Sequence, residues 1–394
     1  MKENNDIVIV SYARTPIGSF LGSLSSIPAT KLGAKAIEGA LDKISLSKDS
    51  VNQVIMGNVL SAGLGQAPAR QAAIYSGLPE SVECLTINKM CGSGLKAIML
   101  AQEAILSGNA DVVVAGGMEN MSLSPHLLKN GRAGNKMGDS KLVDSMINDG
   151  LWDAYNDKHM GSCGEMCAEK YNFSREEQDE FAKGSYTKSQ KATSEGLFAD
   201  EIVPVEVPNR KESITIDRDE EPFRVKFDKI EKLRTVFKKD GTITAANAST
   251  INDGAAVCIL MSAKKAEELN IKPIAKILSQ SSAAQAPEWF TTAPIKAMKK
   301  ATSIAGIKIG EIDLFEINEA FSVVPMAAIK DLNIDSKKVN IYGGGVSLGH
   351  PIGASGARIM CTLLNAMRRQ DAKIGLASLC IGGGEASAMI VEKI

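Results

Sequence analysis

The sequence predicts an α/β protein made of two similar halves, with a long polar section inserted between them. Short β-branched runs alternate with apolar helical patterns near both ends of the chain, which is typical of layered sheets and helices. The section between residues 122 and 250 is more polar and less periodic. We therefore expect an N-terminal α/β half at 1–121, an inserted loop domain at 122–250 and a C-terminal α/β half at 251–394.

A repeated segment supports the division into two halves. Residues 93–99 (SGLKAIM) resemble residues 355–360 (SGARIM), and about 260 residues separate the two copies. A strand pattern follows each copy at a similar distance, at 111–117 in the first half and at 374–384 in the second. The repeat predicts two equivalent buried helices that pack on each other and bring the turns before them together.

Each half has its own series of strand and helix patterns. In the first half we expect strands at residues 7–10, 54–60 and 111–117 and helices at 30–41 and 67–76. In the second half we expect strands at 313–317, 339–341 and 374–380 and a helix at 321–330. Within the insertion, Ser174 and Glu177 form the capping-box pattern that opens a helix.

Cys91 stands in the turn before the first repeated helix, in the run 88–94 (NKMCGSG). Ser93 and Gly94 suit a helix entrance, because serine can cap free N–H groups and glycine lets another chain come close. A helix N-terminus carries partial positive charge, which favours the thiolate form of a cysteine. Cys91 is therefore a candidate nucleophile, although a free cysteine is often only a small buried residue.

Three further segments place one reactive side chain each at the end of an expected strand. Asn318 lies in 318–321 (NEAF), His350 in a glycine-rich loop at 343–356, and Cys380 before the glycines 382–384. Ligand sites in parallel α/β sheets form at the carboxyl ends of strands. His350 could serve as the base that a cysteine nucleophile needs, but it could also be a satisfied core histidine, and Cys380 a buried strand residue.

Composition excludes several other classes of protein. The formal net charge of −1 and the 23% of charged residues give no basis for binding nucleic acid or an anionic membrane. No apolar run reaches the length of a membrane span, and the first residues lack a signal-peptide core. The seven cysteines are scattered without a CxxC pair and the three histidines lie far apart, which favours a reducing, cytoplasmic location and no metal site.

Four motifs together resemble the active-site motifs of the thiolase family: residues 88–94 (NKMCGSG), 318–321 (NEAF), 349–353 (GHPIG) and 380–384 (CIGGG). The resemblance covers essentially the whole chain, including the repeat and the insertion. It implies the thiolase-like fold of layered sheets and buried helices. It also implies the reaction of the short-chain biosynthetic members, a reversible Claisen condensation of two acetyl-CoA to acetoacetyl-CoA and coenzyme A.

The resemblance further implies catalytic roles. Cys91 would carry the acetyl group as a thioester, and His350 would accept the thiol proton. Cys380 would then remove a proton from the methyl group of a second acetyl-CoA. The backbone N–H groups of Cys91 and Gly382 would bind the oxyanion of the tetrahedral intermediate, while His350 and a water held by Asn318 would bind the enolate oxygen. No metal or redox cofactor is implied, and coenzyme A takes part only as substrate and product.

Binding residues are implied by resemblance in the same way. Residues 244–249 (TAANAS) resemble a family segment that contacts coenzyme A, which assigns Ala245 and Ser249 to substrate binding. Ala246 replaces the usual glycine of that segment and raises the question of its backbone geometry. His159 and Met160 resemble the pantetheine contact, although His159 could be a solvated loop residue.

The acyl pocket is the second part of this binding site. Phe237 would form one wall, or else be a core aromatic of the insertion, and Ala320 and Phe321 follow Asn318 in the same motif. Phe290 stands where many short-chain members have a methionine. A phenylalanine there would tighten the pocket towards acetyl groups or reshape it for another short acyl chain.

Several alternatives stay open at this point. The basic residues in 123–144 (Lys129, Arg132, Lys136, Lys141) could belong to a loop that joins two dimers into a homotetramer, or to a solvated surface loop. A degradative 3-ketoacyl-CoA thiolase would use the same catalytic residues on longer chains. A thiolase-like lipid-binding protein without catalysis is the alternative from another functional class.

Overall fold

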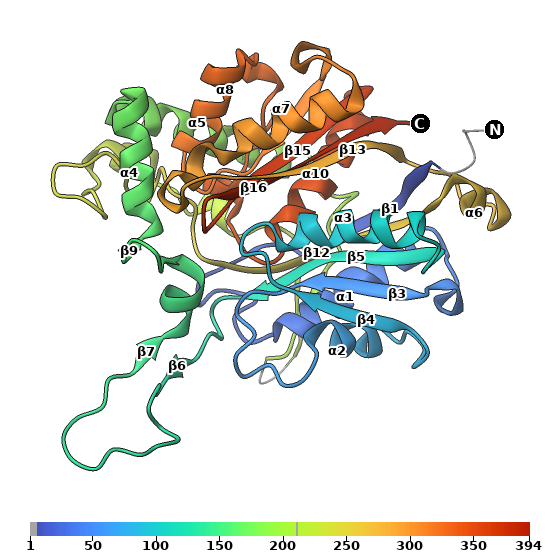
Figure 1. Cartoon of the computed structure of the whole chain (residues 1–394), viewed down its shortest axis with the longest axis horizontal. Helices are drawn as coiled ribbons and strands as arrows, with labels where there is room; N and C mark the ends of the chain where they lie inside the picture. Colours follow the sequence, from blue (N-terminus) through green and yellow to red (C-terminus); the bar gives the residue numbers. More distant parts are fainter. Residues whose placement is uncertain (1–5, 210–211) are drawn as a thin grey trace.

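A computed structural model describes residues 6–209 and 212–394 and shows one continuous twisted sheet built from two halves (Figure 1). The first half has the strand order β4-β3-β5-β12-β1 and the second the order β14-β15-β16-β13. The long strands are β1 (Ile7–Arg14), β3 (Gln53–Gly57), β4 (Glu83–Ile87), β5 (Val112–Asn120), β12 (Asn252–Ser262), β13 (Ala275–Ala284), β14 (Leu314–Ile317), β15 (Ile374–Ile381) and β16 (Glu385–Lys393). A short contact between β1 and β13, at Val8 with Lys276 and Ile9 with Ala275, joins the halves.

Four strands of each half share one topology, as the repeat predicts, and β4 is an additional strand at the edge of the first half. In each set of four, two neighbouring strands run parallel, β3 with β5 and β14 with β15. The next strand, β12 or β16, runs antiparallel to them, and β1 or β13 pairs antiparallel with that strand. Antiparallel pairing of neighbours needs no helical crossover, whereas the parallel pairs are linked through helices.

The boundary between the two halves lies after β12, later in the chain than the sequence predicts. The strand pairs with β5 from Asp253 to Met261 and with β1 from Arg14 to Ile7, so it closes the first half. Residues 252–262 therefore belong structurally to the N-terminal half, although the sequence analysis places the division at 251. Their inclusion depends on pairing with strands far away in the sequence, which a local pattern cannot reveal.

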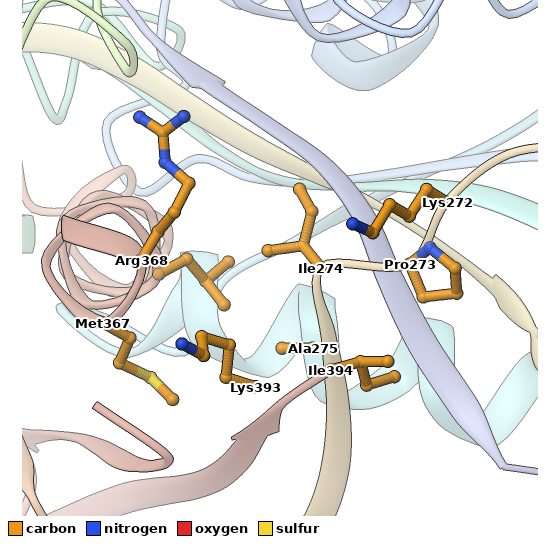
Figure 2. A pocket seen from close by; sticks show the side chains of 9 residues that line it. Lys272, Pro273, Ile274, Ala275, Met367, Arg368, Lys393 and Ile394 are labelled. Carbon is orange, nitrogen blue, oxygen red and sulfur yellow. The ribbon is translucent and has the colours of Figure 1, made fainter. Parts of the chain in front are cut away.

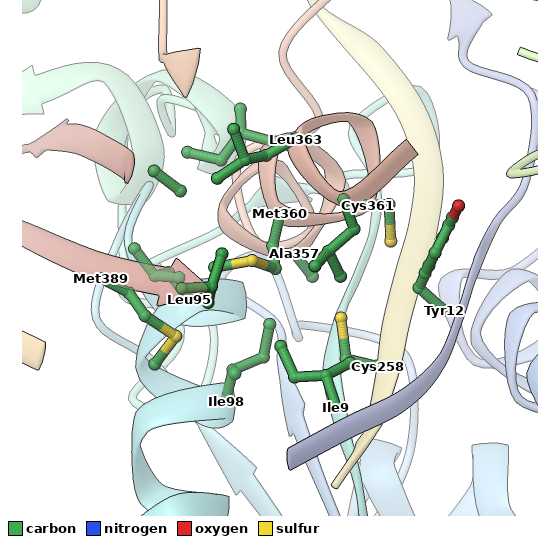
Figure 3. Close-up of a cluster of buried hydrophobic side chains, with 14 of the residues drawn as sticks. Ile9, Tyr12, Leu95, Ile98, Cys258, Ala357, Met360, Cys361, Leu363 and Met389 are labelled. Carbon is green, nitrogen blue, oxygen red and sulfur yellow. The ribbon is translucent and has the colours of Figure 1, made fainter. Parts of the chain in front are cut away.

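The helices form three layers around the sheet. α3 (Ser93–Leu106) and α10 (Ser355–Arg369) lie in the middle layer, where apolar side chains from both halves make one core (Figure 3). α1 (Ala29–Asp42) and α2 (Pro68–Tyr75) cover the other face of the first half. α7 (Ala293–Ala305) and α8 (Val323–Leu332) cover that of the second.

The predicted contact between the repeated helices is confirmed at their N-termini. A Cβ atom on Gly94 would lie 2.7 Å from the amide nitrogen of Ala357, and one on Gly356 would lie 2.3 Å from that of Leu95. Only glycine allows the two backbones to come this close. The contact fixes the turns that precede both helices next to each other, and these turns carry Cys91 and His350.

Part of the insertion lies beside residues that follow β5, β14 and β15, while Val205, Val207 and Ile216 pack against the core of the first half. It contains the short hairpins β6 (His126–Leu127) with β7 (Val143–Asp144), β8 (Trp152–Asp153) with β9 (Lys158–His159), and β10 (Val205–Val207) with β11 (Ile214–Ile216), together with the helices α4 (Met160–Tyr171) and α5 (Arg175–Ser194). The capping box of α5 is confirmed. Arg14 is fully buried on β1 and forms ion pairs with Glu201 and Asp219 of the insertion. These ion pairs connect the insertion to the first half.

The expected strand at 339–341 is wrong. Only Val339 bridges to Phe315, because Asn340 takes a left-handed backbone conformation with φ 46°. Its side-chain amide instead accepts the N–H of Ile317 and donates to the carbonyl of Ile317. These bonds replace the backbone hydrogen bonds that a neighbouring strand would make with β14. The remaining short strand and α-helices are β2 (Gly18–Ser19), α6 (Ala263–Glu268) and α9 (Gly345–Leu348), and the other short helical segments are 3-10 or π turns. No helix in the described residues is long and apolar enough to cross a membrane.

Candidate active site

A cavity of about 280 Å³ lies where the two halves and the insertion meet. Ten of the thirteen residues expected in the site line it: Cys91, His159, Met160, Phe237, Ser249, Phe290, Ala320, Phe321, His350 and Gly382. The walls are mainly apolar, and the polar side chains among them are Cys91, His159, Ser249, Thr250 and His350. Such a cavity, with a few convergent polar groups, is typical of a small-molecule site.

Cys91 occupies a tight turn directly before Gly92, the N-cap of α3. Met90 has φ 48°, a left-handed conformation that is strained for a long side chain. Ser93 stabilises this turn: it accepts the N–H of Lys89 at 2.8 Å and donates to the carbonyl of Met90 at 2.7 Å. Ser93 therefore holds the turn that contains Cys91 and does not cap the free N–H groups of the helix, which differs from the expectation.

Burial dominates the ionisation of Cys91. It raises the pKa of the thiol to about 11, although the N–H groups of Gly382 and of Cys91 itself reach the sulfur and lower the pKa. The helix N-terminus alone suggested a thiol that ionises easily, and that expectation is wrong for the free protein. Ionisation of Cys91 would consequently require a base.

His350 is held by contacts on two sides. Its backbone N–H donates to Asn252 Oδ1 at 2.8 Å, and its ring atom Nδ1 lies 2.5 Å from Ser355 Oγ. Gly349, just before it, has φ 102°, and a Cβ there would lie 2.4 Å from Asn252, so the turn requires glycine. Burial and the guanidinium of Arg358 lower the pKa of the imidazole to about 3, which leaves it neutral and able to accept a proton.

Asn318 and Cys380 lie behind the cavity wall. Asn318 is fully buried, with Nδ2 3.5 Å from His350 Nδ1. The next residue, Glu319, binds Ser185, Asn340 and the N–H of Val346, which joins this segment to the loop that leads to His350. Glu319 is a buried link in the structure that the motif contained but that sequence reasoning did not single out.

Cys380 is the next-to-last residue of β15, and the end of this strand approaches the turn that carries Cys91. A Cβ on Gly92 would lie 2.3 Å from Ile381 Cδ1, so the turns that carry the two thiols are in direct contact. Burial first, and then the neighbouring Cys91, raise the pKa of Cys380 well above its usual value. Both cysteines are therefore thiols in the free protein, and each is positioned to exchange a proton within the site.

The insertion supplies the mouth of the cavity. The ring of His159 stacks on Phe237 with ring centroids 4.7 Å apart, so neither is a solvated side chain. Phe321 packs edge-on against both Phe237 and Phe290. Ser249 is held at the wall because its N–H donates to the carbonyl of Ala320.

The structure bears on two expectations for the segment 244–249. Ala245 is exposed and does not line the cavity, because the chain turns outward at this point. Ala246 is buried without a positive φ, so its replacement of glycine causes no backbone strain. The wall also contains residues that sequence reasoning missed: Met121, Gly150, Leu151, Val236, Ala248, Thr250, Ile251 and Ile352.

The missed residues carried little signal in the sequence. Ile352 lies inside the GHPIG motif and Ala248 inside TAANAS, so an apolar residue beside a polar motif residue could have indicated them. Leu151 ends a short π-helical segment in the insertion, whose place at the cavity depends on long-range folding.

A second cavity, of about 300 Å³, lies elsewhere at the seam between the halves (Figure 2). Its floor is apolar and its rim carries Lys272, Arg368 and Lys393. Arg368 pairs with Asp200 and Lys393 with Asp371, and none of the predicted reactive residues lines it. Within the described residues, no group of three or more His, Cys, Asp or Glu side chains could hold a metal ion.

Comparisons with known proteins agree with this geometry. Residues 7–264 match the N-terminal domain of thiolase and residues 271–393 the C-terminal domain. The chain is 51% identical to an acetyl-CoA acetyltransferase of Schizosaccharomyces pombe, over 99% of this chain and 100% of that one. It is 52% identical to the mitochondrial acetyl-CoA acetyltransferase of Rattus norvegicus, over 99% and 92%.

Solved structures give the same result. The Acat5 thiolase of Ascaris suum in complex with coenzyme A superposes with a TM-score of 0.94 at 46% identity, covering 99% of this chain and 100% of that one. The acetyl-CoA acetyltransferase of Bacillus anthracis superposes with a TM-score of 0.97 at 37% identity, covering 100% of both. With its repeated halves, its paired cysteine turns and these matches along the whole chain, the protein belongs to the thiolase family.

Proposed function

We propose that the protein is an acetyl-CoA C-acetyltransferase, which converts two acetyl-CoA into acetoacetyl-CoA and coenzyme A and also runs in reverse. The observation that carries the proposal is the meeting of Cys91, His350 and the Gly382 N–H in one cavity, with Cys380 directly behind it. The names of the relatives and the coenzyme A complex of a similar structure support the same activity.

The first half of the reaction is an acyl transfer between two sulfur atoms. Cys91 attacks the carbonyl of acetyl-CoA while its proton passes to the neutral imidazole of His350. The oxyanion that forms is stabilised by the N–H groups of Gly382 and Cys91, which already point at the sulfur. The C–S bond to coenzyme A breaks, and His350 returns the proton to the leaving thiolate.

The second half makes the carbon–carbon bond. Cys380 first gives its thiol proton to Nε2 of the neutral His350, and as a thiolate it then takes a proton from the methyl group of a second acetyl-CoA. The enolate oxygen is stabilised by the Nε2–H of the protonated His350 and from the side of Asn318. The enolate carbon attacks the acetyl group on Cys91, and the bond to the Cys91 sulfur breaks. His350 returns its proton to that sulfur, so both cysteines end as thiols and acetoacetyl-CoA leaves.

We propose that no metal or redox cofactor takes part. Every step above moves a proton or an acyl group, and thiols, an imidazole and backbone N–H groups are sufficient for both. Coenzyme A binds as substrate and product between Ser249, Met160 and the stacked rings of His159 and Phe237, which together line the outer part of the cavity.

Acyl-chain preference is the test of this function. Phe290 is buried and contacts Phe321 across the acyl pocket, so it limits the space beside Cys91. We expect wild-type protein to cleave acetoacetyl-CoA with coenzyme A at least tenfold better, in kcat/KM, than 3-ketohexanoyl-CoA. Phe290→Ala should lower this ratio, because the smaller side chain leaves room for the additional methylene groups of the longer substrate. Burial of each methylene group contributes about 0.8 kcal/mol of binding free energy.

Steady-state thiolysis of a series of 3-ketoacyl-CoAs measures the ratio. Phe315→Leu, a change in the core of β14 outside the cavity lining, is the matched control and should leave the ratio unchanged. Equal or better turnover of long chains by the wild type would instead indicate a degradative 3-ketoacyl-CoA thiolase. Binding of coenzyme A without any turnover would indicate a non-catalytic member of the family.

We propose a homotetramer built as a dimer of dimers. β4 is an edge strand of the sheet, and its Leu85 is 44% exposed, which favours pairing with a second copy. The loop between β6 and β7 projects from the body (Figure 1) and exposes Met137 and Leu142.

We expect sedimentation to give four times the 41.8 kDa chain mass. Replacing 130–140 by a short Gly-Ser turn should give a dimer, and a monomeric wild type would contradict this assembly.

We propose a cytoplasmic location, which the free state of all seven cysteines supports. Among the relatives, one from Gibberella zeae is named cytosolic while others are named mitochondrial.

A further inference from the structure

Two histidines face the cavity, and each has a different neighbour at its Nδ1 atom. His159 Nδ1 accepts the N–H of Gly161 at 3.1 Å, as the N-cap of α4. His350 Nδ1 lies 2.5 Å from Ser355 Oγ, in the first turn of α10. In a neutral imidazole one nitrogen donates and the other accepts, so the partner of Nδ1 decides which form Nε2 takes.

The form of His159 follows directly from its contact. A backbone N–H can only donate, so Nδ1 of His159 must present its lone pair. The proton of the neutral ring is then on Nε2, and burial keeps the ring neutral by lowering its pKa. The ring is fixed by its stack on Phe237. His159 therefore presents a hydrogen-bond donor to the cavity.

The form of His350 follows from the second contact of Ser355. Ser355 Oγ also lies 2.9 Å from the carbonyl oxygen of Pro351. A hydroxyl has one hydrogen and a carbonyl can only accept, so the hydroxyl donates to Pro351 and accepts the Nδ1–H of His350. The contact of Asn318 Nδ2 with the same nitrogen, at 3.5 Å, is at the limit of a hydrogen bond.

The remaining nitrogen of His350 is free to react. Nε2 is buried, has no hydrogen-bond partner among the described residues, and belongs to a ring that lines the cavity with Cys91. With the proton on Nδ1, Nε2 carries a lone pair and can accept the thiol proton. With the proton on Nε2, the thiol of Cys91, which is itself a donor, would face the Nε2–H donor and would have no acceptor on the ring.

We propose that Ser355 is a positioning residue that fixes the Nδ1–H tautomer of His350, so that the two cavity histidines are held in opposite tautomers. His159 presents a donor to the substrate, and His350 presents an acceptor to Cys91. The role of Ser355 in catalysis rests on the proposed acyl transfer, but the tautomers themselves do not depend on it.

Nitrogen-15 NMR of the full-length protein, labelled only at histidine, tests the assignment. The chain has three histidines, and His126→Gln and His350→Gln identify the signals. We expect His350 with a protonated Nδ1 and His159 with a protonated Nε2. In Ser355→Ala the His350 signals should shift to the other tautomer or to a mixture, while Ser355→Thr, which keeps the hydroxyl, should restore the wild-type pattern.

Kinetics of the same variants separate positioning from folding. Loss of the orienting partner should lower kcat for thiolysis by about 10–100-fold in Ser355→Ala with little change in KM, and Ser355→Thr should recover most of it. Ser281→Ala removes another buried hydroxyl, which donates to the carbonyl of Ala297 far from the cavity lining, and should leave both kcat and the spectrum unchanged.

Two results would overturn the proposal. One is a wild-type His350 protonated on Nε2, and the other is a Ser355→Ala variant whose tautomer stays the same. Wild-type protein that shows the expected tautomers but cleaves no 3-ketoacyl-CoA would leave the tautomer assignment standing and refute the proposed function alone.

Discussion

Replacing Cys91 by serine is expected to lower kcat for acetoacetyl-CoA thiolysis by at least about 10³-fold. A serine hydroxyl is far less acidic than a thiol, and the buried site already raises the pKa of the thiol to about 11. The neutral His350 can assist a thiol at this position but gives a hydroxyl too little driving force. Acetylation of the protein by acetyl-CoA, followed by intact mass spectrometry, should disappear together with turnover.

Cys84→Ser is the matched control for this variant. Cys84 is also a half-buried, free cysteine of the first half, but it lies on β4 and outside the cavity lining. It should keep wild-type turnover and a single acetylation site. An acetylated Cys91→Ser protein with substantial turnover would show that another residue is the nucleophile.

Replacing Cys380 by serine is expected to separate the two halves of the reaction. Acyl transfer between Cys91 and coenzyme A moves no proton to or from carbon, whereas condensation removes a proton from carbon and thiolysis of acetoacetyl-CoA adds one to carbon. Exchange of labelled coenzyme A with acetyl-CoA should therefore fall less than about tenfold, while condensation should fall by about 10³-fold or more. The ratio of the two rates is the measurement, because a loss of folding would lower both together.

Cys167→Ser tests whether any buried thiol near the site has this effect. Cys167 lies on α4 in the same apolar cluster as Cys380 and contacts the carbonyl of Val323. It should leave the ratio of exchange to condensation unchanged. If Cys380→Ser lowered exchange as strongly as condensation, Cys380 would have no separate role at the carbon acid.

Local chemistry in the sequence predicted much of the site. Motif residues such as Cys91 and His350 lie in turns whose glycines and serines determine the backbone conformation. The local structure around these residues therefore depends on their neighbours in the sequence. The repeat predicted that α3 and α10 meet, because two equivalent buried helices need a common core. Glycines at both helix entrances make that contact possible.

What the sequence could not predict depends on distant partners. β12 was assigned to the wrong half because its place between β1 and β5 is set by pairing across the insertion. Asn340 looked like part of an apolar strand, yet its side chain and left-handed backbone end the pairing there. The ionisation of Cys91 depends on how deeply the assembled fold buries it, and burial outweighs the nearby helix N-terminus.

The position of β12 also has a consequence for how the chain folds during synthesis. β5 ends at Asn120, but the strand that covers its free edge begins only at Asn252. Until that strand leaves the ribosome, β5 has one open edge and β1 has no partner on either side. Open edges invite pairing with other chains, and contacts between residues far apart in sequence form slowly. The nascent first half must therefore wait for the whole insertion to be made, which makes this interval the stage at which the chain most needs protection by chaperones.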